Sequence, residues 1–152
     1  MDLTKLRSGE VTAAIAGIVL AIAIFLPAYS PNLSNPNATV AGERADASIW
    51  VAQHVIRILL LLAAIAPVVL VYIIARGHQL SWPRGEMTAV IGLVAATLLF
   101  YSGIIDRPGE PSGEISLAIG WYLAFVAALV VAGGGAIRSS EFERKRKPPG
   151  VM

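Results

Sequence analysis

Residues 58–75 read ILLLLAAIAPVVLVYIIA, a stretch without a single charge that is bounded by Arg57 and Arg76. An α-helix needs about 20 mostly apolar residues to cross the roughly 30 Å hydrocarbon layer of a bilayer. This stretch therefore predicts a membrane-spanning helix. The composition agrees, because mean hydropathy is +0.69 and only 14% of the residues are charged, against about a quarter in ordinary soluble domains.

Four apolar runs divide the chain, at 11–29, 49–75, 87–105 and 115–137. They predict an all-α polytopic membrane protein, with four transmembrane helices in an antiparallel bundle and a single transmembrane domain over residues 1–152. The segments between the runs are too short to fold alone, which usually takes about 40 residues or more. A cleaved signal peptide is the alternative for the first run, although its apolar part exceeds the usual roughly 7–15 residues.

Lysine and arginine are distributed unevenly around these runs. Nine of the twelve lie on the N-terminal tail, the second connection and the C-terminal tail. Because cytoplasmic segments of membrane proteins are enriched in Lys and Arg, both termini are predicted to be cytoplasmic. Residues 30–48 then form an outer loop, and residues 138–152 form a basic cytoplasmic tail.

The basic tail contains four consecutive cations close to the membrane. Each cation near an anionic lipid surface contributes about 1 kcal/mol, so we expect this run to contact lipid. A docking site for a cytoplasmic partner is the alternative, because short basic runs also bind proteins. The four residues are Arg144, Lys145, Arg146 and Lys147.

The second run is longer than one crossing requires, since 27 helical residues extend about 40 Å. Its uncharged part suffices to span the bilayer, so the residues before it are expected at the outer headgroup region. Gln53, His54 and Arg57 are spaced to share one helix face there. An ionisable residue near a membrane segment is a candidate functional site, although an interfacial arginine can also extend its charge to water.

The outer turn between the last two runs carries the carboxylates that could pair with Arg57. These are Asp106, Glu110 and Glu114. Glu114 also opens the fourth run, where an acid complements the helix dipole without any ligand. The outer polar site therefore has six candidate members, and two of them, Arg57 and Glu114, also have an ordinary structural explanation.

Several kinds of chemistry find no support in the sequence. There is no cysteine, which excludes disulfides and thiolate metal sites. The two histidines and scattered acids match no metal-ligand spacing, and no base stands beside a nucleophile and an orienting group. A formal net charge of +2 does not suggest nucleic-acid binding. We therefore expect no enzyme and no cofactor.

Small residues mark the first and last runs, including the row Gly120, Ala124 and Ala128. Helices pack closely in lipid where small side chains let their backbones approach. The row predicts packing within the bundle, with self-association as the alternative. The short connection between the second and third runs predicts that these two helices are antiparallel neighbours.

The sequence favours a structural or accessory membrane protein, acting in the lipid bilayer and within a larger membrane complex or a self-associated form. A packed bundle is favoured because the central turns of all four runs carry no charge, whereas conduits usually have buried charges. The alternative is a small transporter or channel subunit that works as an oligomer.

Residues 1–10, the segment 25–30 (FLPAYS), the segment 120–123 (GWYL) and the triplet 133–135 (GGG) together resemble a group of small actinobacterial four-helix membrane proteins without an assigned function. The resemblance covers both ends of the chain. It implies a bacterial inner membrane, and it carries over no catalytic or binding residues.

Overall fold

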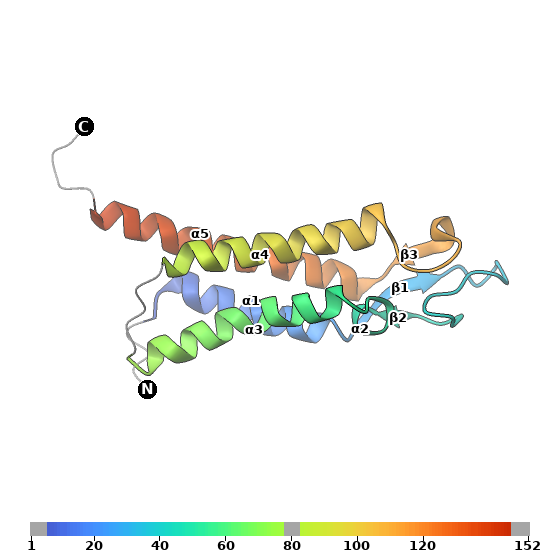
Figure 1. Ribbon diagram of the computed structural model, residues 1–152, viewed down its shortest axis with the longest axis horizontal. Helices are drawn as coiled ribbons and strands as arrows, with labels where there is room; N and C mark the ends of the chain where they lie inside the picture. The colour runs from blue at the N-terminus through green and yellow to red at the C-terminus, as the bar shows by residue number, and fades with distance from the viewer. Residues whose placement is uncertain (1–5, 78–82, 147–152) are drawn as a thin grey trace.

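The computed structural model is mostly helical, with a small sheet at one end (Figure 1). It describes residues 6–77 and 83–146, with no side-chain detail at 84 and 141–146. Within these limits it contains five α-helices, and a π-helical segment at Tyr101–Ile105 continues the fourth. The helices are α1 (Ser8–Ala23), α2 (Ile49–Ala52), α3 (Ile56–Ala75), α4 (Arg84–Phe100) and α5 (Ile119–Arg146).

Three helical segments are long and apolar enough to cross a membrane: Ile56–Ala75, Gly85–Ile105 and Ile119–Ser140. Helix α1 is also apolar but shorter. At 1.5 Å per residue its 16 residues extend about 24 Å. The prediction of a mostly helical chain with apolar membrane-length helices is therefore confirmed for three of the four runs.

The long helices run along one axis (Figure 1). Helix α1 packs between α3 and α5, and α4 packs along α5. Helices α3 and α4, which were predicted to be antiparallel neighbours, do contact each other, but only sparsely. The larger contact of α3 is with α1. We call the end where α1 begins and α5 finishes the termini end, and the opposite end the sheet end.

Glycines bring the helix backbones into direct contact. A Cβ atom on Gly134 of α5 would lie 2.7 Å from the carbonyl oxygen of Gly9 in α1. A Cβ on the adjacent Gly135 would lie 2.6 Å from the carbonyl oxygen of Gly85 in α4. Real Cβ atoms cannot approach so closely, so α5 uses neighbouring glycines to contact two different helices.

A three-stranded antiparallel sheet closes the sheet end. Strand β1 (Pro27–Pro31) lies between β2 (Ala47–Ser48) and β3 (Ile115–Leu117). Tyr29 of β1 pairs with Leu117 of β3 and is fully buried. The outer segment 30–48, expected as a loop, therefore contributes to two strands, and its buried residues Val40 and Ala47 belong to the same apolar core as the helices.

The sheet explains where the helix boundaries differ from the predictions. The first helix ends at Ala23 rather than residue 29, because the residues around Pro27 leave the helix and join β1. The last helix begins at Ile119 rather than residue 115, because Ile115–Leu117 pairs with β1. The same helix continues past residue 137 to Arg146, since long charged side chains are good helix formers.

The second run is interrupted rather than continuous. Gln53 has an extended backbone, with φ −122° and ψ 95°, between α2 and α3. The third run agrees with its prediction at the sheet end, where the helix reaches Ile105 through its π-helical turns.

The glycine triplet provides a matched test of helix packing. Gly133, Gly134 and Gly135 are consecutive, and a Cβ on Gly133 would meet nothing within 4 Å. We expect Gly134→Ala and Gly135→Ala to lower the thermal unfolding midpoint in detergent, because overpacking typically costs about 1–3 kcal/mol. Gly133→Ala should hold or raise the midpoint, because alanine is the better helix former by about 0.5–1 kcal/mol. Equal midpoints for all three variants would contradict the close contacts.

Candidate functional site

A buried ion pair joins the first and last long helices at the termini end. Nε of Arg138 in α5 lies 2.9 Å from Oε1 of Glu10 in α1. The Glu10 side chain is only 3% exposed and that of Arg138 only 18%. The other carboxylate oxygen of Glu10 accepts a 3.0 Å hydrogen bond from the backbone N–H of Arg7. Both oxygens of a buried carboxylate are therefore satisfied.

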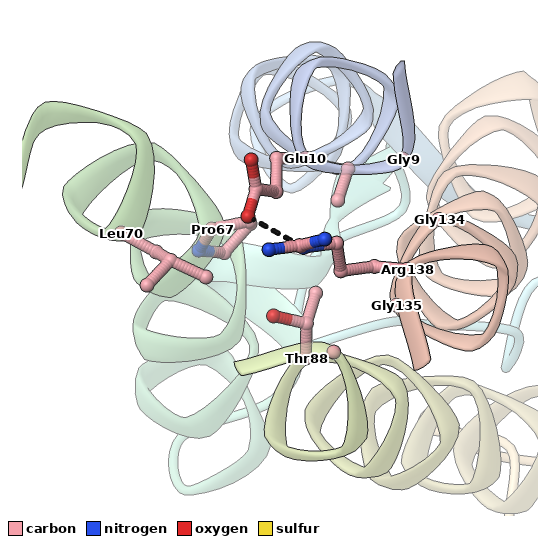
Figure 2. A pocket seen from close by; sticks show the side chains of 10 residues that line it. Gly9, Glu10, Pro67, Leu70, Thr88, Gly134, Gly135 and Arg138 are labelled. Atoms are coloured by element: carbon pink, nitrogen blue, oxygen red, sulfur yellow. Dashed lines mark hydrogen bonds and ion pairs between the residues drawn. The ribbon is translucent and has the colours of Figure 1, made fainter. Parts of the chain in front are cut away.

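The pair lies beside a small cavity where four helices meet (Figure 2). The cavity measures about 10 Å³, room for about one water molecule. Pro67 and Leu70 reach it from α3, and Thr88 reaches it from α4. Thr88 is buried, with 7% exposure. Polar groups from α1, α4 and α5 thus share one spot inside an otherwise apolar interior.

This arrangement suits positioning rather than reaction chemistry. The carboxylate is neutralised by a guanidinium and held by a backbone N–H, so each of its oxygens is fixed in place by a contact from the protein itself. In the described ranges, no group of three or more His, Cys, Asp or Glu side chains could hold a metal ion. The pair can fix the axial positions of α1 and α5 relative to each other. It can also interact electrostatically with a polar group that enters the cavity.

Sequence reasoning assigned Glu10 and Arg138 to separate roles. Glu10 lies in the first turn of α1, where an acid complements the helix dipole, and Arg138 counts toward the basic tail. In the structure the two residues lie beside the glycines that touch, Gly9 and Gly134, a contact that the sequence alone does not reveal. An acid next to one contact glycine and a base four residues after the other are brought together when the helices are antiparallel.

The predicted outer site is only partly assembled. Nη1 of Arg57 donates a 2.9 Å hydrogen bond to the carbonyl oxygen of Trp50, and its guanidinium lies 4.9 Å from the centre of the Trp50 ring. Gln53 and His54 do not continue one helical face with Arg57, because the backbone is extended at Gln53. His54 is exposed. The prediction of a single shared face was therefore wrong.

Two of the three outer carboxylates have partners other than Arg57, and the third residue is paired through its backbone. Oε2 of Glu114 accepts a 2.6 Å hydrogen bond from Asn32. Oδ2 of Asp106 accepts one from the Tyr101 hydroxyl at 3.4 Å, and the Glu110 backbone pairs with that of Thr39. Within the resolved side chains of this group, no ion pair links Arg57 to a carboxylate.

A second buried polar cluster, which the sequence did not indicate, lies where the sheet meets the helices. The Tyr29 hydroxyl donates to Oγ of Ser102 at 3.3 Å, and both side chains are fully buried. Burial raises the pKa of Tyr29 above its usual value, while hydrogen bonds with Ser102 and Gln53 and the charge of Arg107 oppose that shift. The hydroxyl is therefore protonated at physiological pH and acts as a donor.

Arg107 fastens the end of the π-helical segment to the sheet. Its Nε donates to the carbonyl oxygen of Gly103 at 2.9 Å, and its Nη1 donates to the carbonyl oxygen of Ile115. The arginine on the outer turn with a clear structural role is thus Arg107, which satisfies backbone carbonyls on both segments.

The predicted basic tail lies at the termini end. Arg144, Lys145 and Arg146 belong to the last turn of α5, and Lys147 lies outside the described residues. The 28 residues of α5 extend about 42 Å, which exceeds the roughly 30 Å hydrocarbon layer. The helix itself therefore carries these cations beyond its apolar span.

The Glu10–Arg138 pair can be tested by a double-mutant cycle. We expect Glu10→Gln and Arg138→Gln each to lower stability in detergent by about 3–5 kcal/mol, because each leaves a buried group without its partner. The double variant should be more stable than the less stable of the two single variants. Glu86→Gln alters an exposed acid of α4 and should change stability by less than about 0.5 kcal/mol. Strictly additive losses in the double variant would show that the two side chains do not interact.

Comparison with known proteins adds no relative. No protein-family model, no curated protein sequence and no solved structure matches this chain. The arguments about its function therefore rest on its residues and their geometry.

Proposed function

We propose that the chain is a multi-pass protein of a bacterial inner membrane, with four crossings in an antiparallel bundle and both termini cytoplasmic. The fourth crossing is α1. Helix α1 begins where Gly9 contacts Gly134 of α5. The segment after α1 reaches Gly120 of α5, where an added Cβ would lie 2.6 Å from the carbonyl oxygen of Pro27. From Gly120 to Gly134, α5 extends about 21 Å, so α1 and this segment lie at the same depth as the longer helices. The actinobacterial resemblance agrees with this location.

The distribution of charge supports the orientation. The described segments at the termini end contain seven Lys/Arg and four acidic residues, whereas those at the sheet end contain three and five. Positive residues favour the cytoplasmic side. The sheet would therefore face outward.

Cysteine labelling tests this topology, because the chain contains no native cysteine. Ser34 of the sheet end and Ser140 of α5 are both exposed. A membrane-impermeant maleimide should label Ser34→Cys in intact spheroplasts, and it should label Ser140→Cys only after lysis. Labelling of Ser140→Cys in intact spheroplasts would overturn the orientation.

Within this membrane we propose a structural or accessory role without catalysis. The observation that carries the proposal is that helix backbones meet at the glycines and that the buried ion pair satisfies itself. A cavity of about 10 Å³ at that pair is room for a water molecule and too small for a solute path. A protein of this construction acts through its surfaces, on lipid or on a larger membrane protein.

A second candidate is a small transporter or channel subunit that acts as an oligomer, with an outer polar site near Arg57. One observation favours it: Nε of Arg57 is buried and has no hydrogen-bond partner. A buried donor of this kind calls for a water molecule or an anion. Carboxylates would join such a site only if the outer turn rearranged or if a second copy of the chain supplied them. The carboxylates in question are Asp106, Glu110 and Glu114.

Recovery of the tagged chain from native membranes in mild detergent separates the two candidates. We expect a larger membrane protein at fixed stoichiometry, with reciprocal recovery from that partner, and Arg57→Gln should leave the ratio unchanged. A homo-oligomer that passes solutes across liposomes, and loses this activity in Arg57→Gln, would contradict the accessory role and favour the transporter.

A further inference from the structure

A lateral groove opens between α3 and α4, where these two helices contact each other least. It has a volume of about 450 Å³, in the range of small-molecule sites at roughly 300–1,000 Å³. Its walls are almost entirely apolar. Leu62, Ala66, Leu70 and Ile73 line it from α3, and Met87 and Ile91 line it from α4.

The length of the groove matches one leaflet. From Leu62 to Ile73 the wall extends about 16 Å along α3, and half of the hydrocarbon layer is about 15 Å. Toward the sheet end, Leu60 of α3 and Leu99 of α4 are fully buried in the common core, so the groove closes there. Its α4 wall, Met87 to Ile91, lies near the start of α4, so the groove is placed mainly toward the termini end, although Leu62 extends it past the middle of α3.

The groove adjoins a polar site. Pro67, Leu70 and Thr88 line both the groove and the cavity at the ion pair, and Figure 2 shows these three beside Glu10 and Arg138. An apolar groove next to a charged pair suits a molecule with both apolar and polar parts.

An exposed cation lies where that molecule would leave the groove. Arg76 is exposed and lies one helical turn after Ile73, on the same face of α3. Its guanidinium rests 5.1 Å from the centre of the Tyr72 ring. Arg138 remains 18% exposed. Basic pockets between transmembrane helices on the cytoplasmic side characteristically bind anionic lipid head groups.

We propose that the groove binds an anionic phospholipid of the inner leaflet, with one acyl chain between α3 and α4 and its phosphate at Arg76. A partner's transmembrane helix fits less well, because such a helix needs a contact face about 30 Å long, twice the length of this groove. This assignment rests on the proposed membrane orientation, and it identifies lipid as a binding partner of the accessory protein.

Photo-crosslinking in nanodiscs tests the lipid and the site together. The probe is phosphatidylglycerol with a diazirine at mid-chain, and phosphatidylcholine with the same chain is the comparison. We expect phosphatidylglycerol adducts to concentrate on groove residues of α3 and α4, several-fold above those formed by phosphatidylcholine. Arg76→Gln should bring the two lipids to the same level.

Two alanine variants separate groove binding from general lipid contact. Ala66→Phe fills the groove, and Ala136→Phe places the same side chain on an exposed position of α5 away from it. The first should reduce groove adducts several-fold, and the second should leave them unchanged. Adducts spread evenly over all exposed helix faces, equal labelling by both lipids, or crosslinks from the groove to a second protein chain would overturn the proposal. Solute passage in liposomes is measured in a separate experiment. A failure of the proposed accessory role can therefore be distinguished from a failure of lipid binding in the groove.

Discussion

Direct backbone contact at Gly134 and Gly135 is the constraint on which the rest of the structure depends. Helices in lipid gain little from hydrophobic burial, so they associate through close packing and polar contacts. Neighbouring residues on a helix point about 100° apart, and this pair of glycines therefore serves two partners, α1 on one side and α4 on the other. Helix α5 becomes the shared axis against which both are aligned.

The buried ion pair follows from that alignment. With α1 and α5 in contact at Gly9 and Gly134, the side chains of Glu10 and Arg138 meet without room for much water. Charges in a low-dielectric interior are tolerated only when their partners and hydrogen bonds are complete, and here Arg7 supplies the remaining donor. At the sheet end, Tyr29 and Ser102 complete each other in the same way. Each end of the molecule thus joins its helices through one satisfied polar cluster.

The sequence predicted the features that follow from apolar length and missed those that depend on tertiary contact. An uncharged run such as 58–75 is long and apolar enough to cross a membrane whatever it packs against, so the three helices of membrane length could be predicted from the sequence. The strand Ile115–Leu117 was assigned to a helix because its apolar residues adjoin α5, and only pairing with β1 shows otherwise. The separation of Gln53 from Arg57 depends on one extended residue, which residue spacing cannot reveal. The pairing of Glu10 with Arg138 required knowing which helices touch.

The distance of that pair along the chain has a consequence for assembly. Glu10 and Arg138 are separated by 128 residues, which a ribosome takes roughly 6–26 seconds to synthesise at 5–20 residues per second. During that interval α1 and α3 are made before α5, and the carboxylate lacks the Arg138 guanidinium with which it pairs in the final structure. Glu10 lies in the first turn of α1, so its carboxylate can remain at the boundary with water until α5 is made. The last of the described helices therefore completes the ion pair of the first, and the described fold forms only when α5 has joined α1.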